Sequence, residues 1–498
     1  MRLYDAFFFG ALLFLGGILA ASLPAGQAGA GPPAGGASVA WWVAVGGIVL
    51  MLAAWYREEH GWQWKRWASD GWLVMAALLF FLPAGALYYR IDHVAFSRGS
   101  LPENAGPLRA EVVSHPVTRE GVQETILALE GSGLRILARF PVYPALSYGD
   151  NIEFTGRVEE PFSDSYRAYL AKERVRGVIA FPKLVAHEPL TSFSFRGALY
   201  TLRDTIVDSF RRTLPAKEAA LMAGLTVGAR EDFSEEFRDA MAKSGTTHLV
   251  ALSGYNISIL VLVAMSLFLL VFSQRAAFVA TLATILAFVL MTGAEASVVR
   301  AAVMGGIALL ARQAGRVYSM RNAIIFAALV MVIINPKVLA FDLGFQLSFL
   351  ALLGIVYLKP ALDWFVHGKA HGSVFSWREN LTTTASAQLA VAPLLIHTFG
   401  SVSISALAAN ILVLEVVPLT MGLGFILAAV SFLSFFLAKL LGLVAFVFLK
   451  LQTLVIEWFA FLAIPVGPTV SVATALLYYG VLIVFVWYVN TRLIPRRV

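Results

Sequence analysis

The stretch GTTHLVALSGYNIS at residues 245–258 decides how the central part of this chain is built. It holds two threonines, a histidine, two serines, an asparagine and two glycines within apolar surroundings. A regular helix would place His248 and Asn256 on one face, but the Ser253-Gly254 pair favours a break. Breaks at membrane depth are tolerated where the freed backbone groups line water or are buried in protein. We therefore expect a broken or water-lined helix, and the alternative is a kinked helix packed through its polar groups.

The composition around this stretch is that of a membrane protein. Hydrophobic residues make up 59% of the 498 residues and charged residues only 14%, against about 25% charged in a soluble domain. A helix that crosses a bilayer needs about 20 mostly apolar residues. Long apolar runs of this kind lie at residues 6–23, 39–56, 72–89, 261–272, 276–291 and 323–334, with several more after residue 385. The pattern predicts a polytopic α-helical membrane protein with about nine to eleven transmembrane helices, the uncertainty lying after Ile404.

The distribution of Lys and Arg predicts the orientation in the cell membrane. The first loop is uncharged, whereas basic residues gather in the second loop at Arg57, Lys65 and Arg66 and again at the C-terminus. Because basic loops face the cytoplasm, we expect a multi-pass protein with a cytoplasmic N-terminus and with residues 108–190 outside. We attribute the net charge of +7 to these basic cytoplasmic loops and not to a surface that binds nucleic acid. A cleaved signal peptide at the N-terminus is the alternative for the first run.

Residues 108–190 differ in sequence pattern from the rest of the chain. Five short β-like runs are separated by Gly, Pro, Asp and Asn, which predicts a small external β-rich domain, with an OB-like barrel as the best single guess. Some OB barrels bind single strands through basic grooves and stacking aromatic residues. Residues 108–190 hold ten Arg and Lys and eleven Asp and Glu, so the composition of this region does not predict a basic groove. The aromatic residues that could stack bases, or else serve as core or interface, are Tyr143, Tyr148, Phe154 and Tyr166.

The chain is expected to divide into four parts. Residues 1–90 form an N-terminal three-helix membrane segment, residues 108–190 the β-rich domain, and residues 195–245 amphipathic, interfacial helices. In this last region Phe195, Leu199 and Leu202 begin an apolar helical face, which indicates a helix lying in the membrane interface. Residues 246–495 form the membrane domain that holds the polar stretch.

Ionisable and amide side chains recur within the apolar runs of this last part. Charges within spans cost at least about 2.5 kcal/mol each, so they face a cavity or one another. For each residue alone, an interfacial position or a buried pair is the alternative, but the set favours an internal polar pathway. With His248, Ser253, Gly254 and Asn256, the residues expected to line it are Glu295, Arg300, Asp342, Gln346, Asn410 and Glu415.

These stretches resemble the successive motifs of the ComEC family of competence proteins, in the family's order over about residues 217–420. The matching stretches are HLVALSGYNISIL, VVRAAVMGGIALLARQAGR, NPKVLAFDLGFQLSFLALLGI, QLAVAPLLIHTFG and ANILVLEVVPL. The segment DNIEFTGRVEEPFSDSYRAYL is similar to the external domain of that family. The resemblance implies a membrane channel that passes single-stranded DNA into the cytoplasm during natural transformation, with membrane lipid around it.

Two departures from the family pattern limit this interpretation. Many members have a second histidine where this chain has Asn256, so a role that needs two imidazoles is in doubt. Longer members carry a C-terminal metallo-β-lactamase-like domain, and no H-x-H-x-D-H string occurs here. His367 and His371 are spaced i, i+4 among glycines without a carboxylate beside them, and we read them as solvated rather than as metal ligands.

The sequence contains no motif for catalysis or for energy supply. No P-loop and no G-x-S-x-G elbow occur, and no cofactor or metal site is expected. We therefore expect a channel that is not an enzyme and that works with a DNA receptor, a separate nuclease and a cytoplasmic motor. The alternatives are a permease for a small or lipidic solute on the same scaffold and a non-transporting membrane scaffold. The oligomeric state does not follow from the sequence.

Overall fold

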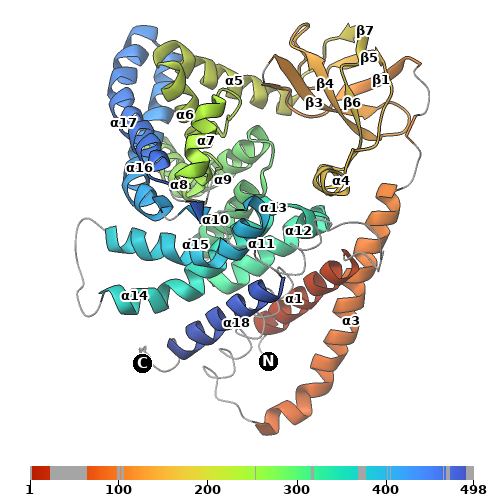
Figure 1. Cartoon of the computed structure of the whole chain (residues 1–498), viewed down its shortest axis with the longest axis vertical. Coiled ribbons are helices and arrows are strands. Elements are labelled where there is room, and N and C mark those ends of the chain that lie inside the picture. Colours follow the sequence, from red (N-terminus) through yellow and green to blue (C-terminus); the bar gives the residue numbers. More distant parts are fainter. Residues whose placement is uncertain are drawn as a thin grey trace.

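A computed structural model describes most of the chain and shows a small β sheet beside a larger helical body (Figure 1). The described residues are 3–22, 64–97, 101–102, 106–119, 121–252, 254–313, 315, 319–367, 377–400, 402–403, 405–463, 465–466 and 472–489.

The sheet has seven strands where the sequence pattern predicted five. The strands are β1 (Leu108–Val112), β2 (Val117–Arg119), β3 (Val122–Leu129), β4 (Arg135–Pro141), β5 (Asn151–Thr155), β6 (Val175–Ala180) and β7 (Lys183–Glu188). Their order is β6-β4-β3-β1-β5-β7, with β2 paired to β3. The pairs are antiparallel except β4 and β6, which run parallel. Helix α4 (Asp164–Ala171) lies in the connection that leads from β5 into β6.

Alternation along the strands builds the core of this domain. Every second residue of β3 is buried, as expected for a strand with one face on a core. The inward side chains of neighbouring strands meet around Leu127, Ile136 and Phe154, all of which are fully buried. The predicted β structure of this region is therefore confirmed as a small sheet, whereas its assignment as an external OB-like domain stays a prediction.

The helical body is built from the segments on both sides of the sheet. Before the sheet lie α1 (Leu3–Ser22) and α3 (Trp64–Ser97). After it come α5 (Phe195–Thr213), α6 (Ala216–Val227), α7 (Glu235–Lys243), the 3-10 helix η1 (Thr247–Leu249), α8 (Gly254–Val271), α9 (Gln274–Met291), α10 (Ala296–Gln313) and α11 (Met320–Ile334). The last group is α12 (Val338–Phe341), α13 (Leu343–Leu353), the π-helical turn η2 (Gly354–Leu358), α14 (Lys359–His367), α15 (Trp377–Phe399), α16 (Ser405–Ser431), α17 (Phe435–Phe461) and α18 (Val472–Tyr488), with the short pair β8 (Val402–Ser403) and β9 (Pro465–Val466).

The surface of the helical body fits a bilayer. Four helical segments within the described residues are long and apolar enough to cross a membrane, and five further apolar helices are shorter. Large apolar side chains such as Leu270, Phe436 and Val447 are well exposed on these helices. Exposed apolar area of this extent marks a surface that is covered by another phase, here lipid. The chain is a membrane protein, and the count of nine to eleven spans remains a prediction.

The first two described helices touch backbone to backbone. A Cβ added at Gly17 would lie 1.9 Å from the carbonyl oxygen of Leu82, and one added at Gly85 would lie 2.0 Å from that of Phe14. Small residues permit such close packing of helices in a membrane. The opposite contacts of α1 are made with α11, where Phe8 and Ala11 pack on Ile325.

The region 195–245 is only partly the interfacial segment expected from the sequence. Helix α5 keeps an exposed side, and Phe195 on its predicted apolar face is itself exposed. Helix α6, by contrast, is buried at every position from Glu218 to Val227, because it packs among α5, α16 and α17. A buried helix of this kind belongs to the core of the helical body and not to its surface.

Candidate functional site

The polar stretch at residues 245–258 is divided between two helices. Gly245 has a φ of +67°, which favours glycine, and an added Cβ there would lie 2.3 Å from the Cβ of Ala406. The chain then forms η1, leaves helical geometry, and starts α8 at Gly254. His248 and Asn256 therefore lie on different elements and do not share one helical face.

Side chains from two other segments bind two backbone carbonyls of this break. The carbonyl of Val250 accepts a hydrogen bond from Nε of Arg230 at 3.1 Å. The carbonyl of Leu252 accepts one from Oγ of Ser297 at 2.6 Å. Unpaired backbone carbonyls at membrane depth are costly, so these two donors stabilise the break in its observed shape.

The polar residues of the stretch have different surroundings. Nδ2 of Asn256 donates to the carbonyl of Leu225 in α6 at 3.0 Å, and the side chain is buried. His248 is exposed, and its Nδ1 lies 3.1 Å from the carbonyl oxygen of Gly245. Gly254 starts α8 beside α10, and Ser253 lies outside the described residues. Asn256 thus packs two helices together, whereas His248 is accessible.

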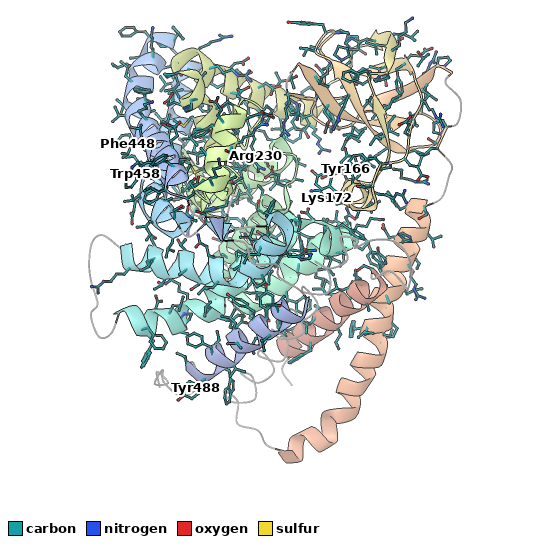
Figure 2. The ribbon with its side chains drawn as sticks, in the orientation of Figure 1. Tyr166, Lys172, Arg230, Phe448, Trp458 and Tyr488 are labelled. Atoms are coloured by element: carbon teal, nitrogen blue, oxygen red, sulfur yellow. The ribbon has the colours of Figure 1, made fainter. Side chains whose placement is uncertain are left out.

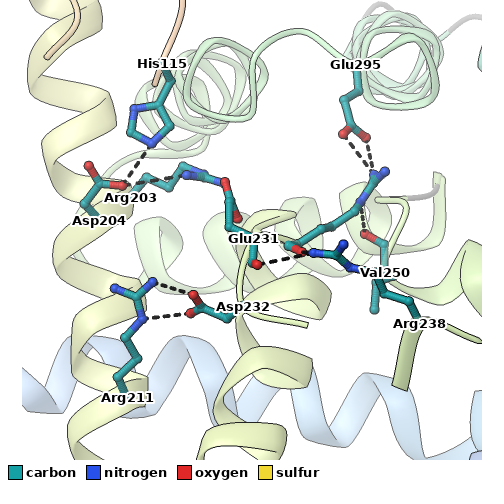
Figure 3. Close-up of polar contacts among 10 residues, drawn as sticks. His115, Arg203, Asp204, Arg211, Glu231, Asp232, Arg238, Val250 and Glu295 are labelled. Atoms are coloured by element: carbon teal, nitrogen blue, oxygen red, sulfur yellow. Dashed lines mark hydrogen bonds and ion pairs between the residues drawn. The ribbon is translucent and has the colours of Figure 1, made fainter. Parts of the chain in front are cut away.

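A network of ion pairs runs from the β-rich domain to this break (Figure 3). It begins at His115, whose Nε2 lies 3.2 Å from Asp204 of α5. Arg203, next in α5, pairs with Glu231 at 2.6 Å. The connection between α6 and α7 then supplies Arg230, whose Nη2 binds both carboxylate oxygens of Glu295, at 2.7 and 2.9 Å.

Glu295 is the point at which this network meets the turn between α9 and α10. Burial raises the pKa of Glu295 above its ordinary value, whereas the positive charges of Arg230, Lys172 and Arg203 oppose that rise. Arg230 thus holds the break and Glu295 at once, which couples the turn before α10 to the start of α8.

Lys172, at the end of α4, connects the β-rich domain to the stretch NPKVLAFDLGFQLSFLALLGI. Its Nζ lies 3.9 Å from Oδ1 of Asp342, and its carbonyl accepts a hydrogen bond from Nδ2 of Asn335 at 2.6 Å. Figure 2 shows Lys172 and Tyr166 on α4, between the sheet and the helices. Asp342 also caps α13, because its Oδ1 accepts from the backbone N–H of Gly344 at 2.8 Å. Sequence reasoning missed Lys172, since no local pattern marks it.

A second set of charges, which we call the seam, fastens the same end of the β-rich domain to the helices. The seam consists of Asp92 at the end of α3, Arg174 before β6 and Lys337 before α12. Asp92 pairs with Lys337 at 2.5 Å and with Arg174 at 3.1 Å. Lys337 is only 1% exposed, and Arg174 adopts a φ of +59°, unusual for a residue with a side chain. One carboxylate therefore joins three segments that are distant in sequence.

Arg300 lies in α10, the helix that follows Glu295. Its Nη1 donates to the carbonyl of Ser348, and its guanidinium carbon lies 5.7 Å from the centre of the Phe349 ring. Among the described residues, no carboxylate forms an ion pair with Arg300. Nearby in α13, Gln346 is buried and donates to the carbonyl of Ala340 at 2.8 Å.

The two predicted residues on α16 differ in their surroundings. Asn410 is fully buried, and neither Nδ2 nor Oδ1 has a hydrogen-bond partner among the described residues. Glu415 is exposed and accepts a hydrogen bond from Asn380 of α15 at 2.6 Å.

Helix α10 connects several of these positions. It packs on α8, α9, α11 and α13, so Gly254, Glu295, Arg300 and the α13 residues lie around one helix. Glu415 belongs instead to the pairing of α15 with α16.

The aromatic residues considered for base stacking separate into different roles. Phe154 is buried in the sheet core, and Tyr148 packs on Tyr200 of α5 with ring centres 5.4 Å apart. Tyr143 is exposed. Tyr166 stands between Phe162 and Tyr169, with ring centres 4.9 and 6.3 Å apart.

The described part of the chain holds no group of three or more His, Asp or Glu side chains arranged for a metal ion. His371 lies outside the described residues.

Comparison with known proteins gives two matches. The model of the Competence protein family matches residues 225–492, which hold the divided stretch and all of the later motifs. ComE operon protein 3 of Bacillus subtilis (strain 168) is 27% identical over 275 residues, which are 53% of this chain and 34% of that protein. The match thus spans about a third of the length of this relative. No solved structure matches the chain.

Proposed function

Because the chain belongs to the Competence protein family, we propose that it forms the membrane path through which a single strand of DNA enters the cytoplasm. The observation that carries this proposal is the helix break between Leu249 and Gly254, where Arg230 and Ser297 bind the carbonyls of Val250 and Leu252. A transport path through a bilayer needs polar groups at membrane depth that are held in place without a continuous helix. The break supplies such groups inside the matched region.

In this proposal the β-rich domain stands outside the cell and is an OB-like barrel that presents the strand to the helices. The ion pairs of His115 with Asp204 and of Lys172 with Asp342 support a fixed position of the domain next to the break. The chain has no cysteine, so one introduced at the exposed Ser132 tests the orientation. An impermeant maleimide is expected to label it in intact cells, and protection of this position until the cells are opened would reverse the orientation.

The proposed role involves transport without a chemical step. A DNA receptor, a separate nuclease and a cytoplasmic motor are then supplied by other proteins, and lipid surrounds the helices.

The test is flux of fluorescent oligonucleotides into proteoliposomes that contain the purified chain. We expect a single strand to enter, a duplex of the same length to be excluded, and His248→Leu to reduce entry by removing a polar group from an accessible position. The exposed Arg275 on α9 provides a control, since Arg275→Gln lies away from the break. Entry of small solutes without oligonucleotide would favour a permease, and no flux of either kind would favour a scaffold.

A further inference from the structure

We propose that Arg300 is a binding point for the phosphodiester backbone of the passing strand. This inference rests on the proposed function and adds a ligand chemistry to one side chain. Arg300 is a permanent cation in a membrane helix, and its described contacts are a neutral carbonyl and an aromatic ring. Neither contact neutralises its charge.

The cost of such a position is large in general. A cation at membrane depth is disfavoured by at least about 2.5 kcal/mol, and buried charges are normally paired. The two buried cations Lys337 and Arg203 follow that rule, since Lys337 pairs with Asp92 and Arg203 pairs with Glu231, whereas the half-buried Arg300 does not. The exception at Arg300 therefore indicates an anion that is supplied by a ligand.

The contacts of Arg300 leave it able to take such a ligand. The guanidinium has five N–H donors, and the carbonyl of Ser348 is the one acceptor it meets among the described residues. Guanidinium groups bind phosphate oxygens in bidentate fashion, and the Phe349 ring lies beside the group, 5.7 Å from its carbon. The planar donors are thus available to a phosphate while the side chain stays oriented.

The position fits a path along the break. Arg300 follows Ser297 by three residues on α10, so both lie on neighbouring turns of the same helix. Ser297 holds the carbonyl of Leu252, and Ala301 lies beside the first residue of α8. A strand that passed the break would therefore meet Arg300 on the adjoining helix.

The experiment compares Arg300→Gln with wild type in detergent, with Arg275→Gln as the matched control. Glutamine keeps a donor for the carbonyl of Ser348 but removes the charge. We measure binding of a short oligothymidine, of a peptide nucleic acid with the same bases and no phosphates, and of phosphatidylglycerol. The thermal midpoint of each variant is recorded beside the affinities.

We expect Arg300→Gln to weaken oligothymidine binding by about 10- to 150-fold, the range for one charged hydrogen bond. The slope of log affinity against log salt is expected to fall by about 0.7, because one phosphate contact is lost. The thermal midpoint is expected to hold or rise, since an unpaired charge is removed. Binding of the peptide nucleic acid is expected not to change.

Several results would overturn the inference. They are unchanged oligothymidine affinity in Arg300→Gln, a fall in the midpoint that parallels the loss of binding, and a dependence on Arg300 seen with phosphatidylglycerol only. If wild type carries oligonucleotide in proteoliposomes and Arg300→Gln carries it equally, this inference fails while the proposed function stands. If wild type carries none, the proposed function itself fails.

Discussion

The seam and the helical core differ in how their polar side chains are paired. In the seam, Asp92 meets both Lys337 and Arg174, so the carboxylate and both cations are paired. In the core, Arg300 has no carboxylate partner and the amide of Asn410 has no hydrogen-bond partner among the described residues. Paired charges offset much of their desolvation cost, whereas unpaired groups keep it. The comparison indicates that the seam fixes structure, and we propose that the unpaired groups of the core are kept for contacts made during function.

The largest expected effect comes from breaking the seam with Asp92→Asn. The change leaves Lys337 buried without a carboxylate, which is expected to lower the free energy of unfolding by about 3–5 kcal/mol. Unfolding in mixed micelles measures the loss, and proteolysis near α4 reports release of the β-rich domain.

The matched control for the seam is Glu160→Gln, which removes an exposed pair with Arg167 and should cost no more than about 1 kcal/mol. The double variant Asp92→Asn with Lys337→Met is expected to regain part of the stability, since it also removes the buried positive charge that Asp92→Asn leaves unpaired. Equal stability of Asp92→Asn and Glu160→Gln would show that the seam does not hold the domain.

Asn256→Leu is expected to have the next largest effect. It leaves the carbonyl of Leu225 without a donor, at a cost of about 1–3 kcal/mol. The accessible His248 provides the comparison, since His248→Leu is expected to change stability by no more than about 0.5 kcal/mol while reducing flux. The measurement is the unfolding free energy of each variant beside its oligonucleotide flux. A larger loss of stability in His248→Leu would contradict the assignment of Asn256 to packing.

Asn410→Leu tests whether the unpaired amide in the helical core lowers stability. Removing two unpaired amide atoms is expected to raise the free energy of unfolding by about 1–3 kcal/mol, together with a loss of flux. Gln452→Leu is the control, because Nε2 of Gln452 already donates to Thr420 at 2.9 Å and that bond would be lost. A fall in stability in Asn410→Leu would mean that its amide is satisfied in the membrane.

The smallest effect is expected at Glu415, which belongs neither to the charges of the seam nor to the unpaired groups of the core. Its partner Asn380 can also donate to a glutamine oxygen, and Glu415 itself is exposed. Glu415→Gln is therefore expected to change the unfolding free energy by no more than about 0.5 kcal/mol. A loss of more than this, or a loss of flux, would assign Glu415 to the path after all.

The sequence predicted the elements of the fold better than their number. The break followed from the Ser253-Gly254 pair, and α8 begins at the glycine. Two strands were missed in the β-rich domain for separate reasons. Strand β2 has only three residues, too few for a visible alternation. Strands β6 and β7 were read as one run because their separation at Phe181 depends on a single left-handed residue.

The site could be predicted only as a set of candidates. Lys172 and Asp92 meet residues of the helical body from distant parts of the chain, and local patterns carry no information about such pairs. The same limit applies to α5, where Arg203 lies outside the predicted apolar face and is nevertheless buried, because Glu231 reaches it from the next connection. Apolar periodicity shows which faces are covered, but it does not show which charges find partners.

The close contact of α1 and α3 at Gly17 and Gly85 has a consequence for biosynthesis. The partner that covers the other side of α1 is α11, which starts at Met320 and is therefore translated long after α3 ends at Ser97. At about 5–20 residues per second, the ribosome needs roughly 10–45 s to make the chain between them. The packed pair of α1 and α3 must persist in the bilayer for that time without its later neighbour. Backbone contact through the two glycines lets the newly inserted pair hold together until α11 arrives.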